Sequence, residues 1–197
     1  ILQFSDANTT DYSARFSTAN NPAYKIDTNG KDISFASALD STASTFYKYG
    51  AGTLTLTNAS RFSVNTVGAT TIDAGTLALR VAHPTAIDTA AVFSGAGTLA
   101  LENSNASSAT GFSSSVTLST DLLFNTGGSS LGGLTIGRTG NTANLVVDAL
   151  PTGLSVTGSQ AYYGGTVTIP VNANANIVTR NNAGLLTLSA QTDVSIL

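Results

Sequence analysis

A seven-residue motif, Gly-Ala-Gly-Thr-Leu-Thr-Leu at residues 50–56, constrains the fold of this chain more than any other feature. It returns as Asp-Ala-Gly-Thr-Leu-Ala-Leu at 73–79 and as Gly-Ala-Gly-Thr-Leu-Ala-Leu at 95–101. The second copy follows the first by 23 residues, and the third follows the second by 22. A fixed period of this size is typical of proteins built from stacked structural repeats.

Each copy has the pattern of a short strand that follows a turn. A glycine adopts the positive φ angles of a tight turn without steric cost. After it, leucine and threonine alternate, which places the leucines on one face of a strand and the threonines on the other. So short a strand cannot bury its apolar face alone, and the next copy must stack on it. The predicted repeat core is Leu54, Leu56, Leu77, Leu79, Leu99 and Leu101.

Composition agrees with an all-β chain. Serine and threonine supply more than a quarter of the 197 residues, and there are 19 glycines. Threonine suits strands, and glycine and asparagine suit turns. The sequence therefore predicts an all-β fold, a β-solenoid of the parallel β-helix type, with a β-sandwich of many short strands as the structural alternative.

The repeats resemble a known family. Residues 50–57, followed by Thr-Thr-Ile-Asp-Ala-Gly-Thr-Leu-Ala-Leu at 70–79, are similar to the autotransporter-associated β-strand repeat. The similarity covers residues 50–101, about a quarter of the chain. It implies a right-handed parallel β-helix on a bacterial surface, in an autotransporter passenger or a related secreted protein that acts as an adhesin or scaffold. Because the repeat is a structural unit, the resemblance assigns no catalytic residue.

The whole chain, 1–197, is expected to form a single solenoid domain. Residues 1–49 hold eight of the fourteen aromatic residues and are interpreted as a divergent N-terminal cap or starting module. Residues 50–101 carry the best repeats, and 102–197 are expected to form degenerate coils. Roughly nine coils, spaced as neighbouring strands are, are expected. Further expected strands include Ala14–Ser17, Phe62–Val67, Leu122–Phe124 and Ile177–Thr179.

Charge and cysteine content exclude several classes of function. Only 10% of the residues are charged, the net charge is -3, and the eight Lys and Arg form no cluster. Nucleic-acid binding needs a concentrated basic face, so no nucleic-acid partner is expected. There is no cysteine, so a disulfide, a thiolate metal site and a thiol nucleophile are excluded. No apolar run approaches the ~18 residues of a membrane-spanning helix, so no membrane insertion is expected.

The residues that could carry chemistry are few. His83 is the only histidine, and no Gly-x-Ser-x-Gly motif accompanies it, so it is expected to be a solvated loop residue. The acids lie scattered along the chain, among them Asp73, Asp88, Asp121 and Asp148. Tyr162 and Tyr163 could stack on a sugar, but adjacent strand residues point to opposite faces. The sequence predicts no catalytic residue, no cofactor and no metal site.

The two ends of the chain are apolar and uncharged. A solenoid has an exposed strand edge at each end, which proteins normally protect with charge, proline or a helix. The sequence shows no such protection at the C-terminus, so we expect either that the chain continues in a longer protein or that this end pairs with the start of another copy by strand addition. The candidate self-assembly residues are Ile1, Leu2, Phe4, Val194, Ile196 and Leu197.

Three functions remain open on the sequence alone. The first is a non-enzymatic extracellular structural protein whose copies join head to tail into a fibre or surface layer. The second is a passenger fragment of a bacterial autotransporter adhesin, with a host or matrix surface as partner. The third is a β-helix that binds or cleaves a polysaccharide.

Overall fold

The computed structural model describes residues 1–17, 19, 21–37, 39, 44–58, 67–104, 111–171 and 184–197. The backbone alone is described for residues 67 and 68. The expected strand at 177–179 lies outside these residues, as does nearly all of an expected strand at 62–67.

The structure is all-β, with very little helix. In chain order the strands are β1 (Leu2–Gln3), β2 (Ala23–Asp27), β3 (Ile33–Phe35), β4 (Ser44–Tyr49), β5 (Thr53–Leu56), β6 (Val67–Ile72), β7 (Thr76–Val81), β8 (Phe93–Asn103), β9 (Val116–Thr117), β10 (Ser130–Ile136), β11 (Leu145–Val146), β12 (Ser155–Val156), β13 (Gln160–Ile169) and β14 (Leu186–Ile196). The only α-helix of the described residues is α1 (Leu118–Asp121), and single 3₁₀ turns lie at Ser13–Arg15, Pro84–Ala86 and Thr126–Gly128.

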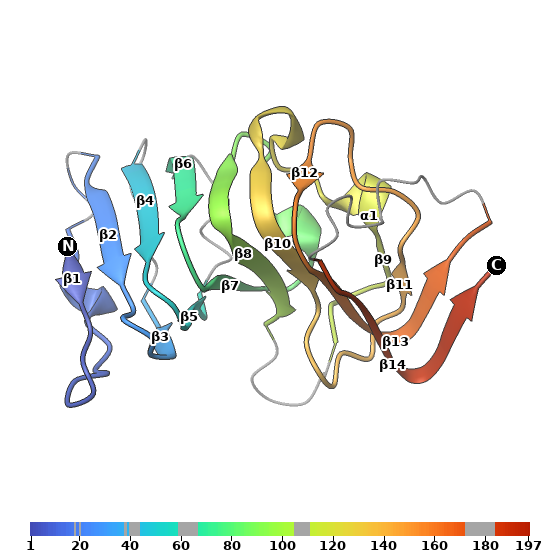
Figure 1. The fold of residues 1–197 in the computed structure, drawn as a ribbon, viewed down its shortest axis with the longest axis horizontal. Helices are drawn as coiled ribbons and strands as arrows, with labels where there is room; N and C mark the ends of the chain where they lie inside the picture. Colours follow the sequence, from blue (N-terminus) through green and yellow to red (C-terminus); the bar gives the residue numbers. More distant parts are fainter. Residues whose placement is uncertain are drawn as a thin grey trace.

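The strands coil around one axis as a parallel β-helix. One face contains β1, β2, β4 and β6 with the first parts of β8 and β10, and a second face contains β3, β5 and β7 with the later parts of β8 and β10 and the first part of β13. Pairing between the named strands is parallel throughout, which excludes the β-sandwich. From the N-terminal end the chain descends the first face and returns behind it, so the coil is right-handed (Figure 1).

The predicted leucine core is confirmed. Leu54 pairs with Leu77 and then Leu99, while Leu56 pairs with Leu79 and then Leu101. All six of these leucines are at most 5% exposed. The second of these ladders begins at Phe35 and continues through Ile136 and Tyr162 to Leu188. Side chains of one kind thus stack from coil to coil at the ~4.8 Å spacing of neighbouring strands.

The solenoid has about seven turns, fewer than the nine expected. The early turns keep the period of the sequence repeat, since Leu79 pairs with Leu101, 22 residues later. Leu101, however, pairs with Ile136, 35 residues later, because an excursion containing β9 and α1 lies between them. Longer coils consume more chain, so the same length gives fewer of them.

Two expected strands are wrong. Residues Ser13–Arg15 form a 3₁₀ turn where a strand was expected at 14–17. Leu122 and Phe124 are buried, but they follow α1 in irregular backbone. In both places an apolar residue reaches the core from a turn, so alternation alone did not reveal the backbone conformation.

Aromatic residues fill the N-terminal part of the core. Phe16 packs against Tyr24 and Phe35 with ring centroids 5.8 Å apart in each pair, and Tyr24 lies 6.3 Å from Phe46. Phe35 also lies 6.2 Å from Phe4. The aromatic composition of residues 1–49 therefore reflects a core of large rings that begins at the first coil.

Candidate functional site

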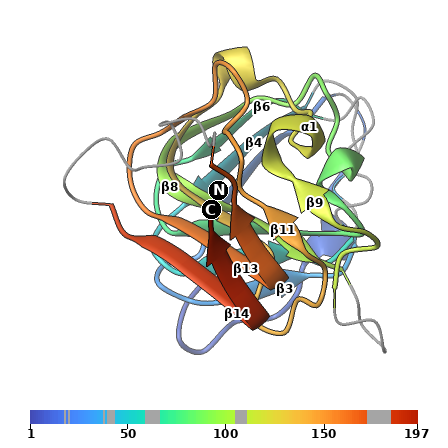
Figure 2. The same ribbon diagram turned by 90° about the vertical axis from the view of Figure 1, so that its right-hand side faces the viewer.

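The C-terminal end of the solenoid is an open strand edge. Strand β14 pairs with β13 from Leu186 to Ile196, and no other described strand pairs with it (Figure 2). Inward-facing side chains of β14 have a coil on one side only, and Ile196 is 72% exposed, while Val194 is 40% exposed. Leu197 is 67% exposed. An apolar core end and a long unpaired edge thus coincide.

The hydrogen-bond pattern shows which backbone groups of β14 face outward. The backbone N–H of Leu197 donates to the carbonyl of Ile169 on β13 at 2.9 Å. In a parallel pair, successive residues bond to opposite sides of the strand. The N–H groups of Val194 and Ile196 therefore face the free edge, where a further strand would accept them.

The N-terminal end is better protected. The side chain of Asp11 accepts a hydrogen bond from the backbone N–H of Ala36 at 2.8 Å, and Ser13 Oγ accepts one from Ser37 N–H at 2.9 Å. Burial tends to raise the pKa of Asp11, but hydrogen bonds from Ser13 and Ala36 outweigh it, so the pKa lies below the ordinary 3.8. These side chains occupy donors just beyond β3. The backbone donors of Ala36 and Ser37 are thereby unavailable to an added strand.

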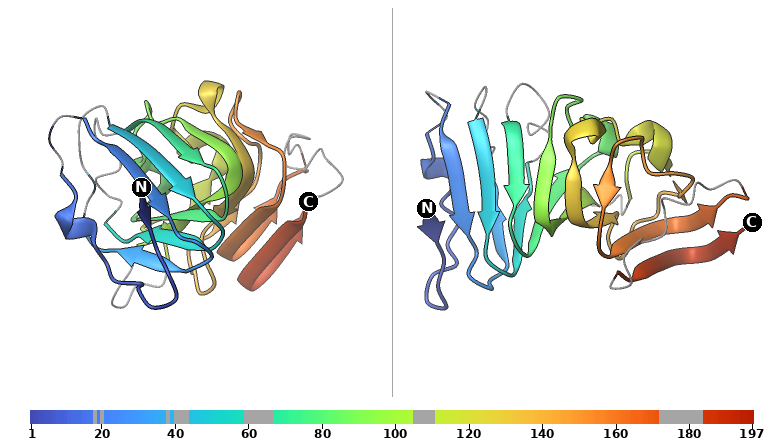
Figure 3. Two further views of the ribbon diagram at one scale, coloured as in Figure 1. Left: turned by 60° about the vertical axis from the view of Figure 1, so that its left-hand side comes forward. Right: turned by 45° about the horizontal axis from the view of Figure 1, so that its top comes forward.

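The first strand, in contrast, is left open. Among the described strands β1 pairs only with β2, and Ile1 is 81% exposed. Strand β1 lies at the N-terminal end of the solenoid (Figure 3). Beside it, Leu2, Tyr12, Arg15 and Phe16 line a shallow cavity of about 230 Å³ whose walls are almost wholly apolar. Only Phe4 of the candidate assembly residues is buried, at 1% exposed. Its ring contributes to the core rather than to the outer surface.

His83 is not the solvated loop residue that the sequence predicted. Its side chain is 13% exposed and lies edge-on to Phe112, with ring centroids 6.2 Å apart. Nδ1 lies 3.4 Å from the backbone N–H donor of Thr85, and Nε2 lies 3.2 Å from the carbonyl oxygen of Ser115. The ring therefore ties together two turns, with Asp121 Oδ2 3.9 Å from Nε2.

The acids and the tyrosine pair also have structural positions. Asp121 accepts a hydrogen bond from Thr117 N–H at 2.7 Å, and Asp88 accepts one from Ala90 N–H at 2.7 Å. Tyr162 is buried and Tyr163 is half-buried on the opposite side of β13, so the pair does not form one platform. Among the described residues, no group of three or more His, Asp or Glu is arranged to hold a metal ion.

Sequence reasoning missed two features of the fold. The capping pair, Asp11 and Ser13, carries a signal in the Asp-x-Ser spacing that favours local side chain to backbone hydrogen bonds. The other is Lys48, which is fully buried and stacks between Ile26 and Ile72. The alternation along Ser44–Tyr49 places Lys48 on the inward side of β4. Because lysine is charged, this inward position was not predicted.

No protein-family model, no curated protein and no solved structure matches this chain. Helices long and apolar enough to cross a membrane are absent from the described residues.

Proposed function

We propose that this chain is a non-enzymatic structural β-solenoid whose copies join end to end by strand addition. The observation that carries the proposal is the open β14 edge, eleven residues long, with exposed Val194, Ile196 and Leu197 beside it. In an isolated molecule such an edge is a template for pairing with another chain. A second copy of this chain can pair with the β14 edge without any other protein being required.

The opposite end of the axis offers a surface that fits. The chain termini lie at opposite ends of the solenoid (Figure 1). The N-terminal end presents the free side of β1 and the apolar cavity lined by Leu2, Tyr12 and Phe16. The exposed apolar residues at the end of β14 match this cavity in chemistry. A head-to-tail contact of this kind does not close on itself and produces an open filament.

A location outside a bacterial cell belongs to the same proposal. Low charge, abundant serine, threonine and glycine, and the resemblance of residues 50–101 to autotransporter-associated repeats support it. A passenger domain of an adhesin is the second form of the proposal. In that form the solenoid is a spacer that holds a binding surface away from the cell.

Two matched pairs of substitutions test the assembly. Val194→Lys with Ile196→Lys places charge at the open end, whereas Thr166→Lys with Thr168→Lys places the same charge on outward positions of the neighbouring strand β13. Sedimentation velocity over a concentration series, with electron microscopy of the largest species, should show filaments for the wild type and the β13 pair. The β14 pair should remain monomeric. A wild-type protein that stays monomeric at millimolar concentration would refute the proposal.

A further inference from the structure

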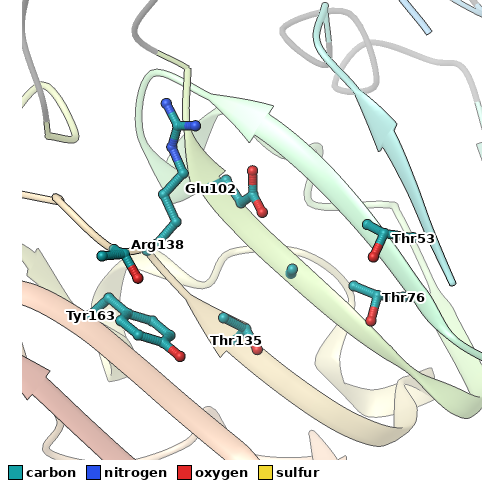
Figure 4. Close-up of a pocket in the computed structure, with 9 residues that line it drawn as sticks. Thr53, Thr76, Glu102, Thr135, Arg138 and Tyr163 are labelled. Atoms are coloured by element: carbon teal, nitrogen blue, oxygen red, sulfur yellow. The ribbon is translucent and has the colours of Figure 1, made fainter. Parts of the chain in front are cut away.

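The outward side of the second face of the solenoid contains a groove that has no role in the fold or in the proposed assembly. It has a volume of about 250 Å³ and lies across β5, β7, β8, β10 and β13 (Figure 4). This volume is below the about 300–1,000 Å³ of pockets that enclose a small molecule. A site of this size suits one segment of an extended ligand that lies across the strands.

The strand register explains why the groove exists. One outward row runs from Arg80 to Glu102, since these residues are paired between β7 and β8. Leu101 pairs with Ile136 and Ile136 with Tyr162, so the row continues through Gly137 to Tyr163. Glycine has no side chain, and the gap left between Glu102 and Tyr163 spans two strand spacings, about 10 Å.

Small residues form the floor of the groove. In the next outward row, Ala78, Ala100 and Thr135 are paired in sequence across β7, β8 and β10. Ala100 and Thr135 line the groove, and Thr76 lines it at the far side from Tyr163 (Figure 4). Gly137 cannot be replaced by a larger residue in this backbone, because its φ is +78° and an added Cβ would lie 2.2 Å from the carbonyl oxygen of Tyr163.

The groove lining combines polar and apolar surface in similar amounts, and its charge is balanced. The carboxylate of Glu102 accepts a hydrogen bond from Arg80 Nε at 3.3 Å, and Arg138 stands at the rim beside Tyr163. Threonine hydroxyls both donate and accept hydrogen bonds. The Tyr163 side chain supplies an aromatic wall with a polar tip, the combination found where one side of a ligand is apolar and the other polar.

Sugars have this combination of surfaces, because their rings carry C–H groups on their faces and hydroxyl groups around their edges. We propose that the groove binds a segment of an uncharged polysaccharide, with one sugar ring against Tyr163 and its hydroxyls directed to Glu102 and Thr135. The chain of sugars lies along the solenoid axis, across the strands. Among the residues that line the groove, Glu102 is the one carboxylate.

A single carboxylate gives binding without cleavage. Glycoside hydrolysis generally uses two carboxyl groups about 5–9.5 Å apart on either side of the scissile bond. The ligand is therefore held and released unchanged. This function is independent of the end-to-end assembly, since the groove lies on the side of the solenoid and the assembly surfaces lie at its ends.

Affinity electrophoresis tests the proposal with native gels that contain amylopectin, hydroxyethylcellulose or galactomannan, and with pectate as the charged comparison. The wild type should be retarded in at least one of the three neutral polymers and not in pectate. Tyr163→Ala should weaken the retardation at least tenfold. Tyr49→Ala, which removes a half-buried outward tyrosine of β4 on the other face, should leave it unchanged.

A second variant distinguishes loss of binding from loss of folding. Thr135→Phe keeps a β-favouring residue on β10 and fills the groove, so it should abolish retardation while the far-ultraviolet circular dichroism stays that of the wild type. Absence of retardation in all three neutral polymers would overturn the proposal. Retardation that depends on Tyr49 and not on Tyr163, or retardation by pectate alone, would overturn it as well.

Discussion

Lys48 makes the stability of the solenoid depend on pH in a direction that can be worked out from its surroundings. Its side chain is fully buried, and its ammonium group donates hydrogen bonds to the carbonyls of Tyr49, Gly50 and Ala74 at 3.0, 2.6 and 3.1 Å. Burial lowers the pKa of Lys48 from 10.5 to about 8, and the charges of nearby aspartates offset only part of this effect.

The sign follows from proton binding. Between pH 8 and 10.5 the unfolded chain holds a proton on this lysine that the folded chain has released. The free energy of unfolding therefore rises with pH over this window. With the two pKa values above, the rise from pH 7.5 to 9.5 is about 2 kcal/mol, at about 1.4 kcal/mol for each pH unit of full difference.

Comparison with Lys48→Met isolates this contribution, because the tyrosines and the other titrating groups are common to both proteins. Urea unfolding of both proteins at pH 7.5, 8.5 and 9.5 should show the wild type gaining about 2 kcal/mol relative to the variant. In the variant three turn carbonyls lose the hydrogen bond from Lys48, so the variant starts from a different stability, and only the change with pH is diagnostic. A stability difference that stays constant, or moves toward the variant, would refute a buried lysine with a lowered pKa.

Three further predictions concern the core and the turns. Leu99→Ala should lower the free energy of unfolding by about 2–5 kcal/mol in urea titrations, because Leu99 is fully buried in the ladder; a loss under 1 kcal/mol would contradict that position. Gln160→Leu should cost about 1–3 kcal/mol because the Tyr162 hydroxyl, which donates to Gln160 Oε1 at 2.7 Å, loses its acceptor, and adding Tyr162→Phe should recover most of the loss in a double-mutant cycle. In thermal melts Gly52→Ala should cost several times more than Gly30→Ala, because both have positive φ but only Gly52 would place Cβ 2.4 Å from a backbone oxygen; equal shifts in melting temperature would count against the close stacking of turns.

The part of the fold that sequence could predict is the part where each coil repeats. Leu54 and Leu77 recur at the period of the coil, and alternation with threonine fixes the face on which they lie. The core residues and the stacking of the coils could therefore be predicted. The excursion between Leu101 and Ile136 has no repeat to reveal its length. The number of coils therefore could not be predicted, because that number depends on how much chain each turn consumes.

Of the two candidate sites, one could be predicted from the sequence and the other could not. The apolar residues Val194 and Ile196 were found because a solenoid end without charge or proline is visible in the sequence. The groove at Tyr163 was not found, because it arises where Gly137, just after β10, lies between Glu102 on β8 and Tyr163 on β13. These three residues become neighbours only through the register of the strands, and their spacing along the chain does not predict that register.

End-to-end assembly is tested most directly by mixing two variants, each blocked at one end. Phe4 N–H donates to β2 at 3.0 Å, so the N–H of Gln3 faces the free side of β1, and Gln3→Pro removes that donor. Ile196→Pro removes the corresponding donor from the free side of β14. Mass photometry should find each variant alone as a monomer and the equimolar mixture as a dimer that grows no further. If Gln3→Pro alone forms dimers while Ile196→Pro stays monomeric, the β14 edges pair with each other, and head-to-tail assembly is wrong.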